Sequence, residues 1–288
     1  MKNIISSILL VLILFHTNLN AQAQTDKNNF LITTDGTRLF VQKSGDGPIC
    51  IFIHGGPGAW SESFRKLRGN NLEKRLTMVY YDQRGCGRSG KPVNGDYSLN
   101  TMIDDIDLIR QHYHAEKVYL LSHSFGGILA VNYALKYPEH VKGLILANST
   151  LDLRNSLESQ LNYINSLLQT NFHPADSTPS SVMSTFMQAR TALTKRGLAY
   201  KMLSDNKENV DLLNKVDSHS PGNNDFAQRA FQIDDYWKDY TTMTNMIDVP
   251  VLNYNRKKRS RSWREPLPAI SFQKSESQKN RWWAFTLF

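Results

Sequence analysis

Ser124 lies in the pattern Ser122-His-Ser124-Phe-Gly126, which directly follows a short apolar run and opens a helix-forming stretch. The apolar run, residues 118–121, predicts a buried strand, so the serine stands in a strand–turn–helix context. A turn this tight needs small residues two positions before and after the serine, and Ser122 and Gly126 fill those positions. Such a turn lifts the Ser124 hydroxyl out of the sheet and directs a helix N-terminus toward it, which favours the negative charge of an acyl-transfer intermediate. The pattern indicates a nucleophilic serine, with an ordinary Ser/Gly-rich turn as the alternative.

Two further blocks stand upstream, and each follows a predicted strand. His54-Gly-Gly-Pro-Gly58 follows the apolar run 50–53. Glycines let the backbone approach a substrate closely and leave amide N–H groups free to bind an oxyanion. The other block, Asp82-Gln-Arg-Gly-Cys-Gly-Arg-Ser89, follows the predicted strand 77–81. Three such blocks, each at a strand end and in this order, make a chance match improbable.

From about residue 28 to 150, these blocks resemble the prolyl aminopeptidase (proline iminopeptidase) branch of the α/β-hydrolases. The resemblance implies a serine hydrolase that removes an N-terminal residue, such as proline, from a small peptide, with no cofactor and no metal. It implies Ser124 as the nucleophile and the amides of Gly56 and Phe125 as the oxyanion hole. Gly55 is an alternative donor.

The turn around Ser124 differs from this branch at Ser122 and Phe125, because the branch usually has Gly-Gly-Ser-Trp or Gly-His-Ser-x there. These departures weaken the proline assignment more than the fold, and two alternatives stay open, the second because the triad acid and base are missing from their expected places. One is an esterase-like hydrolase of the same fold, acting on a small acyl compound. The other is a non-catalytic or truncated protein of that fold.

The order of strand and helix patterns predicts an α/β fold with a doubly wound, mostly parallel sheet over residues 24–150. A hairpin about Asp35-Gly36 comes first. From 151 to 245 apolar residues recur at helical spacing, so we expect an inserted helical cap. Residues 246–252 begin the seventh strand, and we expect the C-terminal strands beyond it to be missing or disordered. Helices are expected at 60–75, 100–114 and 125–136.

In aminopeptidases of this branch, carboxylates of the cap hold the substrate's amino group. The resemblance therefore makes three carboxylates candidates for this role, because they lie in the predicted cap. A solvated helix face is the alternative for each of them. The cap also carries an aromatic group that we interpret as cap core. The carboxylates are Glu158, Asp234 and Asp235, and the aromatic residues are Phe231, Tyr236, Trp237 and Tyr240.

The second half of a Ser-His-Asp triad is missing from its expected place. In this fold the acid follows the seventh strand and the histidine follows the eighth. Residues 253–288 contain no histidine and no aspartate, and all eight histidines of the chain precede the seventh strand. Asp152, after the sixth strand, is an alternate acid, and His219 in the cap is an alternate base.

A one-nucleotide frame offset near Leu252 would explain this segment. Codons chosen for Asn253 to Ser260 read, one nucleotide later, as Ile-Ile-Thr-Gly-Lys-Lys-Asp, a strand followed by a turn with the triad acid. Codons for Lys279 to Phe285 similarly give Lys-Thr-Gly-Gly-Gly-His. In the chain as written, Arg259 and Ala284 occupy the acid and base positions. The alternative is a genuine basic tail, 253–288.

Residues 1–23 predict a secretory signal peptide. Lys2 precedes the apolar run 4–15, and Ala21-Gln-Ala23 offers a small-x-small cleavage site. We expect cleavage after about Ala23, export to the periplasm or beyond, and no stable membrane insertion afterwards. An uncleaved membrane anchor is the alternative.

The formal net charge of +8 is concentrated at one end of the chain. Residues 253–288 carry a net +7 and Lys2 adds one, so residues 24–252 balance to zero. A neutral core argues against a nucleic-acid partner, although the tail could bind an anionic surface. The two cysteines, Cys50 and Cys86, form no disulfide framework, and we expect buried free thiols.

Overall fold

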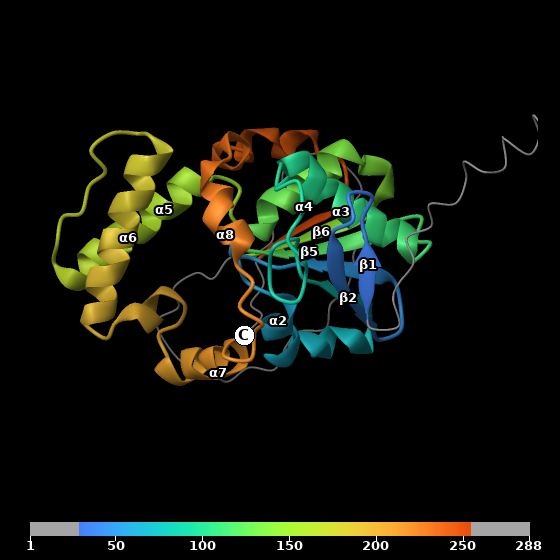
Figure 1. Ribbon diagram of the computed structural model, residues 1–288, viewed down its shortest axis with the longest axis horizontal. Helices are drawn as coiled ribbons and strands as arrows, with labels where there is room; N and C mark the ends of the chain where they lie inside the picture. Colours follow the sequence, from blue (N-terminus) through green and yellow to red (C-terminus); the bar gives the residue numbers. More distant parts are fainter. Residues whose placement is uncertain (1–28, 255–288) are drawn as a thin grey trace, which may run out of the picture.

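Stretches of three to seven residues, most of them rich in apolar residues, form the strands of one sheet, and helices between them cover both of its faces (Figure 1). A computed structural model describes residues 29–254. The strands are β1 (Phe30–Ile32), β2 (Arg38–Ser44), β3 (Ile49–Ile53), β4 (Thr77–Tyr81), β5 (Val118–His123), β6 (Val141–Ala147) and β7 (Val251–Tyr254). The helices are α2 (Ser61–Lys66), α3 (Leu99–His112), α4 (Gly126–Lys136), α5 (Leu153–Leu168), α6 (Pro179–Lys195), α7 (Lys207–Asp217) and α8 (Asp225–Arg229). Shorter 3₁₀ turns are Gly69–Lys74, Pro138–His140, Ala199–Met202, Ala230–Gln232, Asp234–Trp237 and Thr241–Met246.

The strand order is β1-β2-β4-β3-β5-β6-β7. β1, β2 and β4 pair antiparallel, and every pair from β4 to β7 is parallel. The predicted mostly parallel α/β sheet is therefore confirmed, as is the hairpin about Asp35-Gly36. Parallel pairing brings the carboxyl ends of β3, β5, β6 and β7 to one edge of the sheet, which is where loops with chemistry gather in this architecture.

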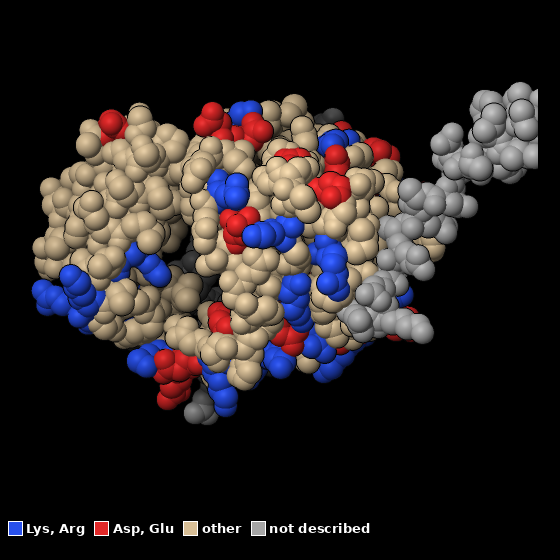
Figure 2. All heavy atoms as spheres, in the orientation of Figure 1, with Lys and Arg blue, Asp and Glu red and all other residues tan. Residues whose placement is uncertain are grey.

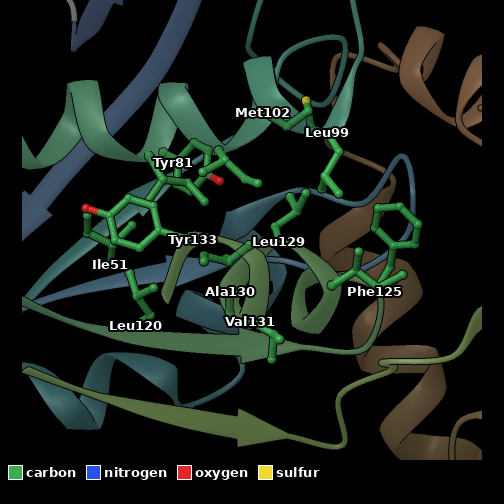
Figure 3. Close-up of a cluster of buried hydrophobic side chains, with 14 of the residues drawn as sticks. Ile51, Tyr81, Leu99, Met102, Leu120, Phe125, Leu129, Ala130, Val131 and Tyr133 are labelled. Atoms are coloured by element: carbon green, nitrogen blue, oxygen red, sulfur yellow. The ribbon is translucent and has the colours of Figure 1, made fainter. Parts of the chain in front are cut away.

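Alternation along the buried strands divides the core between the two faces of the sheet. Ile51 and Ile53 face a large cluster to which α3 and α4 contribute, shown in Figure 3. Cys50 and Phe52 face a smaller cluster, where the Phe52 ring stacks on Phe64 of α2 with centroids 4.0 Å apart. The helices thus hold the sheet from both sides and fix where its strands end.

Two predicted elements differ from the structure. The helix expected over 60–75 is divided into α2 and a 3₁₀ turn, because Arg68 between them adopts a left-handed conformation with φ of 79°. The seventh strand, expected from 246 to 252, instead spans Val251–Tyr254. Thr241–Met246 is a 3₁₀ turn, and pairing with β6 begins only after Pro250, which has no N–H to donate.

This correction moves the predicted domain boundary. Asn253 and Tyr254 belong to β7, not to the basic tail, and Tyr254 is buried. The rest of the tail, the signal peptide and the predicted cleavage site lie outside the described residues. Cys50 and Cys86 are both buried free thiols, as expected.

Residues 151–245 form helices and 3₁₀ turns. α5 and α6 make a lobe beside the sheet, and α7 lies near α2 on the lower side in Figure 1. Leu161 and Ile164 of α5 pack against Ala189 and Leu193 of α6, which holds the two helices together. Within residues 29–254, no helix combines the length and apolar character needed to cross a membrane.

Candidate active site

Ser124 directly follows the end of β5, two residues before the start of α4, and has a φ of 50°. A non-glycine residue rarely adopts this left-handed conformation, which is a feature of functional turns. Its carbonyl oxygen accepts hydrogen bonds from the Gly127 amide at 2.9 Å and the Thr150 amide at 2.8 Å. These bonds tie the strained residue to α4 on one side and to the segment after β6 on the other.

Small residues surround Ser124 because the space allows nothing larger. A Cβ added to Gly126 would overlap the Ile53 carbonyl oxygen, and one added to Gly55 would lie 2.8 Å from the Ser124 Cβ. Ser122 is fully buried, and its hydroxyl lies 2.8 Å from the Ser149 hydroxyl. Ser122, where the branch usually has glycine, is therefore accommodated by a hydrogen bond to Ser149.

Ser124, Gly56 and Phe125 line one cavity of about 170 Å³, so the structure brings the three principal predicted residues together. Gly56 has a φ of 118°, which favours glycine, and Phe125 precedes α4. Gly55, the alternative donor, is buried beside Ser124 and does not line the cavity. The remaining lining comes from the segment after β6 and from the cap: Thr150, Leu153, Ser156, Leu157, Gln160, Phe186 and Phe231.

His54 holds the glycine-rich loop in place and is not free to act as a base. The Gln83 amide lies 2.9 Å from its Nε2, and because an amide can only donate, Nε2 is the acceptor. Nδ1 then carries the hydrogen and donates to the Gly55 carbonyl at 2.9 Å. Burial lowers the pKa of His54, which keeps the ring neutral.

Residues 82–89 hold the loops around the site in place through buried hydrogen bonds and ion pairs. Asp82 is fully buried and accepts hydrogen bonds from Ser61 and Arg88. Burial by itself would raise the pKa of Asp82, but the bonds and charge of Arg88 lower it below its usual value. Arg84, also buried, makes a bidentate ion pair with Asp105 at 2.7 Å for each bond. These contacts are structural, and they explain why the motif carries charged residues without lining the cavity.

None of the alternate acid and base residues reaches Ser124. Asp152 caps the N-terminus of α5 by accepting from the Asn155 amide at 3.0 Å. His219 is exposed at the end of α7, and its Nδ1 donates to the Lys215 carbonyl at 2.8 Å. His140, which was not a predicted base, is also engaged elsewhere, with its Nδ1 3.1 Å from an Asp107 carboxylate oxygen on α3. Positions 259 and 284, where the acid and base are expected, lie outside the described residues.

The cap carboxylates also lie away from the cavity. Glu158 and Asp234 are exposed, and Asp235 pairs with Lys238 at 2.6 Å. Of the predicted cap aromatics, Tyr236 and Tyr240 are buried core residues as interpreted, whereas Phe231 lines the cavity. Within residues 29–254, no group of three or more His, Cys, Asp or Glu side chains is placed to hold a metal ion.

Sequence reasoning missed the cap half of the cavity. Leu153 and Leu157 could have been found, because they begin the apolar face of a helix with four-residue spacing. Gln160 and Thr150 could not have been found in this way, because the sequence around a single polar residue does not show whether its side chain faces a cavity.

Comparisons with known proteins agree with this geometry. A family described as the alpha/beta hydrolase fold matches residues 48–258. The chain is 36% identical over 96 residues to a proline iminopeptidase of Thermoplasma volcanium, covering 33% of this chain and 32% of that protein. It is 35% identical over 124 residues to a proline iminopeptidase of Heyndrickxia coagulans, covering 42% of each. The chain therefore spans about a third to two-fifths of the length of these relatives.

Other similarities extend the picture beyond aminopeptidases. A cis-3-alkyl-4-alkyloxetan-2-one decarboxylase of Shewanella oneidensis is 32% identical over 126 residues, covering 43% of this chain and 39% of that protein. A proline iminopeptidase-related protein from Thermus thermophilus has a similar structure, with a TM-score of 0.60 at 20% identity over 80% of this chain and 81% of the other. The matched blocks confirm the resemblance to the prolyl aminopeptidase branch, and with the family match over most of the chain they lead to one conclusion. The chain belongs to the α/β-hydrolase family.

Proposed function

We propose that this fold serves a Ser124-dependent hydrolase of small acyl compounds. Ser124 Oγ attacks the acyl carbonyl carbon and passes its proton to a base, while the amides of Gly56 and Phe125 receive the developing oxyanion. The leaving alcohol or amine departs with a proton, and water then releases the acyl group from the serine. The observation that carries the proposal is the strained Ser124 at the cavity shared with Gly56 and Phe125.

Two substrate types are candidates. Release of an N-terminal residue, such as proline, is supported by the relatives named proline iminopeptidase. Cleavage of a small ester is supported by the cavity lining, to which the described part of the chain contributes no carboxylate that could hold a free amino group.

We also propose that the full catalytic apparatus needs the offset frame. Without a base Ser124 is a weak nucleophile, and loss of a triad member lowers kcat by about 10⁴–10⁶. The nucleotide sequence across codons 250 to 260 tests this. Genomic DNA whose shifted frame yields stops, or no Gly-x-x-Asp and Gly-Gly-His motifs, would refute the offset.

Fluorophosphonate labelling followed by peptide mass spectrometry tests the function itself. In the frame-restored protein we expect rapid labelling of Ser124, with Ser124→Ala abolishing both labelling and turnover of aminoacyl-arylamides and small esters. Ser122→Ala is the matched control and should still be labelled at Ser124. The chain as written should label slowly or not at all. Labelling at Ser122, or turnover by Ser124→Ala, contradicts the assignment.

Export is a separate proposal that rests on the sequence of residues 1–23. After expression in a bacterium with a periplasm, the secreted fraction should begin at about Gln24. A protein retained in the cytoplasm with Met1 or Lys2 at its N-terminus would contradict it.

A further inference from the structure

Among residues 29–254, no charged side chain lines the cavity beside Ser124. Its walls are apolar at Leu153, Leu157, Phe186 and Phe231, and polar but neutral at Thr150, Ser156 and Gln160. The lobe formed by α5 and α6 is also mostly uncharged on the face shown in Figure 2. A charged substrate group entering this cavity would lose water and gain no counter-ion, which is costly.

The nearest charge along α6 is positive. Arg190 lies one helical turn beyond Phe186, on the same side of the helix. It is half-buried, burial lowers its pKa, and within residues 29–254 no carboxylate forms an ion pair with it. The carboxylates nearest in sequence to the lining are otherwise engaged or exposed, since Asp152 caps α5 and Glu158 faces solvent. The electrostatic surroundings therefore oppose a cation.

The size of the cavity limits the acyl group. An apolar cavity of about 150 Å³ is enough for a benzene ring, and this one measures about 170 Å³. It therefore accommodates an acyl group of roughly six heavy atoms. Gln160 adds hydrogen-bonding capacity, because its amide is only weakly engaged, with Nε2 3.4 Å from the Ser156 hydroxyl.

We infer that the Ser124 cavity selects a short, uncharged acyl group and excludes one that carries a free ammonium. The inference rests on the proposed Ser124 hydrolase and names its substrate class: neutral acyl esters or amides. Leu157 and Phe186 contact the hydrocarbon part, and Gln160 tolerates a neutral polar atom but offers no countercharge.

Equilibrium binding to the full chain tests the inference without requiring catalysis. The probes are cyclopentanecarboxamide and prolinamide, which have nearly the same shape but differ by a ring CH₂ against a ring NH₂⁺ at pH 7. Ligand-observed NMR titration should give a dissociation constant at least tenfold lower for the neutral amide. Gln160→Glu supplies the missing carboxylate, so the ratio of the prolinamide to the cyclopentanecarboxamide dissociation constant should fall by about tenfold or drop below one. Asn162→Asp makes the same amide-to-carboxylate change at an exposed position of α5 outside the lining, and it should leave the preference unaltered.

Several outcomes would overturn the inference. These are equal binding of the two amides, tighter binding of prolinamide by the parent chain, no binding of either amide, and equal shifts from Asn162→Asp and Gln160→Glu. Failure of the proposed function appears separately, as a frame-restored protein that is not labelled at Ser124. The binding preference and the labelling can therefore succeed or fail independently.

Discussion

In the turn that carries Ser124, Gly126 has no room for a side chain. One hydrogen atom faces the Ile53 and His54 carbonyl oxygens, and a Cβ in its place would lie 2.8 Å from the latter and overlap the former. α4 therefore begins in direct contact with the end of β3. This contact fixes the distance between Ser124 and the loop that carries Gly56.

Replacing Gly126 by alanine should be costly in both stability and reactivity. Overpacking of this kind reduces the free energy of unfolding by about 1–3 kcal/mol, and the displaced α4 should slow Ser124 labelling in the frame-restored protein. Urea denaturation and labelling rates measure the two effects. Gly90→Ala is the matched control, because its nearest neighbours are 3.5 Å away and its φ is ordinary. Parent-like values for Gly126→Ala would contradict this account.

At the same scale, the sequence was sufficient to predict that residues of three recognisable turns come together. Ser124, Gly56 and Phe125 belong to such turns and meet at one cavity. Gln160 was not predictable, because its position depends on how the cap packs over the sheet. The Ser122–Ser149 hydrogen bond was equally hidden, since it joins residues 27 positions apart.

At the scale of secondary structure, α3 is joined to α4 by hydrogen bonding to one carboxylate, that of Asp107. Asp107 accepts hydrogen bonds from Arg110 and Gln111 of its own helix and from Tyr133 of α4. Burial raises the pKa of Asp107, but these bonds outweigh it and lower the pKa to about 2. The lowered pKa means that the folded state prefers the charged carboxylate more strongly than the unfolded chain does.

The stabilisation that Asp107 contributes should decrease in acid. The contribution of Asp107 is fully present above about pH 4, since its unfolded pKa is near 3.8, and it is lost as pH falls toward 2. Melting temperatures from about pH 6 to 2.5 should therefore fall less for Asp107→Asn than for the parent, from a lower starting value. Asp46→Asn, at an exposed loop, should follow the parent curve. A parallel curve for Asp107→Asn would exclude this role.

α8 connects the cap to the loops that carry Gly56 and Phe125, although it is only five residues long. Phe226 is fully buried, with its ring centroid 5.8 Å from that of Phe125, and Ala227 contacts Gly58 closely enough that a glycine is required there. Figure 3 shows Phe125 pointing from the start of α4 toward the cap ribbon. The Phe226 amide also donates to the Gly85 carbonyl at 3.2 Å.

Phe226→Leu should therefore loosen the loops that carry Gly56 and Phe125 more than the rest of the fold. Stability should fall by about 1 kcal/mol, and hydrogen exchange should accelerate in segments 54–58 and 122–127. Phe64→Leu removes a comparable ring from the opposite face of the sheet and serves as the control. Equal acceleration in both variants would show that the effect is general destabilisation.

Helix and strand boundaries were less predictable than the elements themselves. Apolar runs located β3, β4 and β5, because buried parallel strands are continuous apolar runs. They could not predict the left-handed Arg68 that divides the helix over 60–75. Nor could they show that Asn253 and Tyr254 continue β7, since polar residues satisfy backbone pairing as well as apolar ones.

For the whole molecule, β7 is the last strand of the sheet within the described residues, with β6 as its neighbour on one side. An uncovered edge strand is a template for aggregation. We predict that the 24–288 product is poorly soluble or readily proteolysed, whereas the frame-restored protein is monodisperse. Size-exclusion chromatography and limited proteolysis compare them, and equal thermal transitions would contradict the prediction.

The hydrogen bonds and close contacts around Ser124 also bear on the order of synthesis. Ile53, Gly55, Ser149 and Thr150 all precede residue 151, so a ribosome has delivered every one of them before the cap emerges. The Asn148 amide donates to the Tyr254 carbonyl at 2.6 Å, one of the contacts that join this region to the last described strand. The contacts around Ser124 therefore join residues that are synthesised early, and the proposed frame offset near Leu252 lies downstream of every one of them.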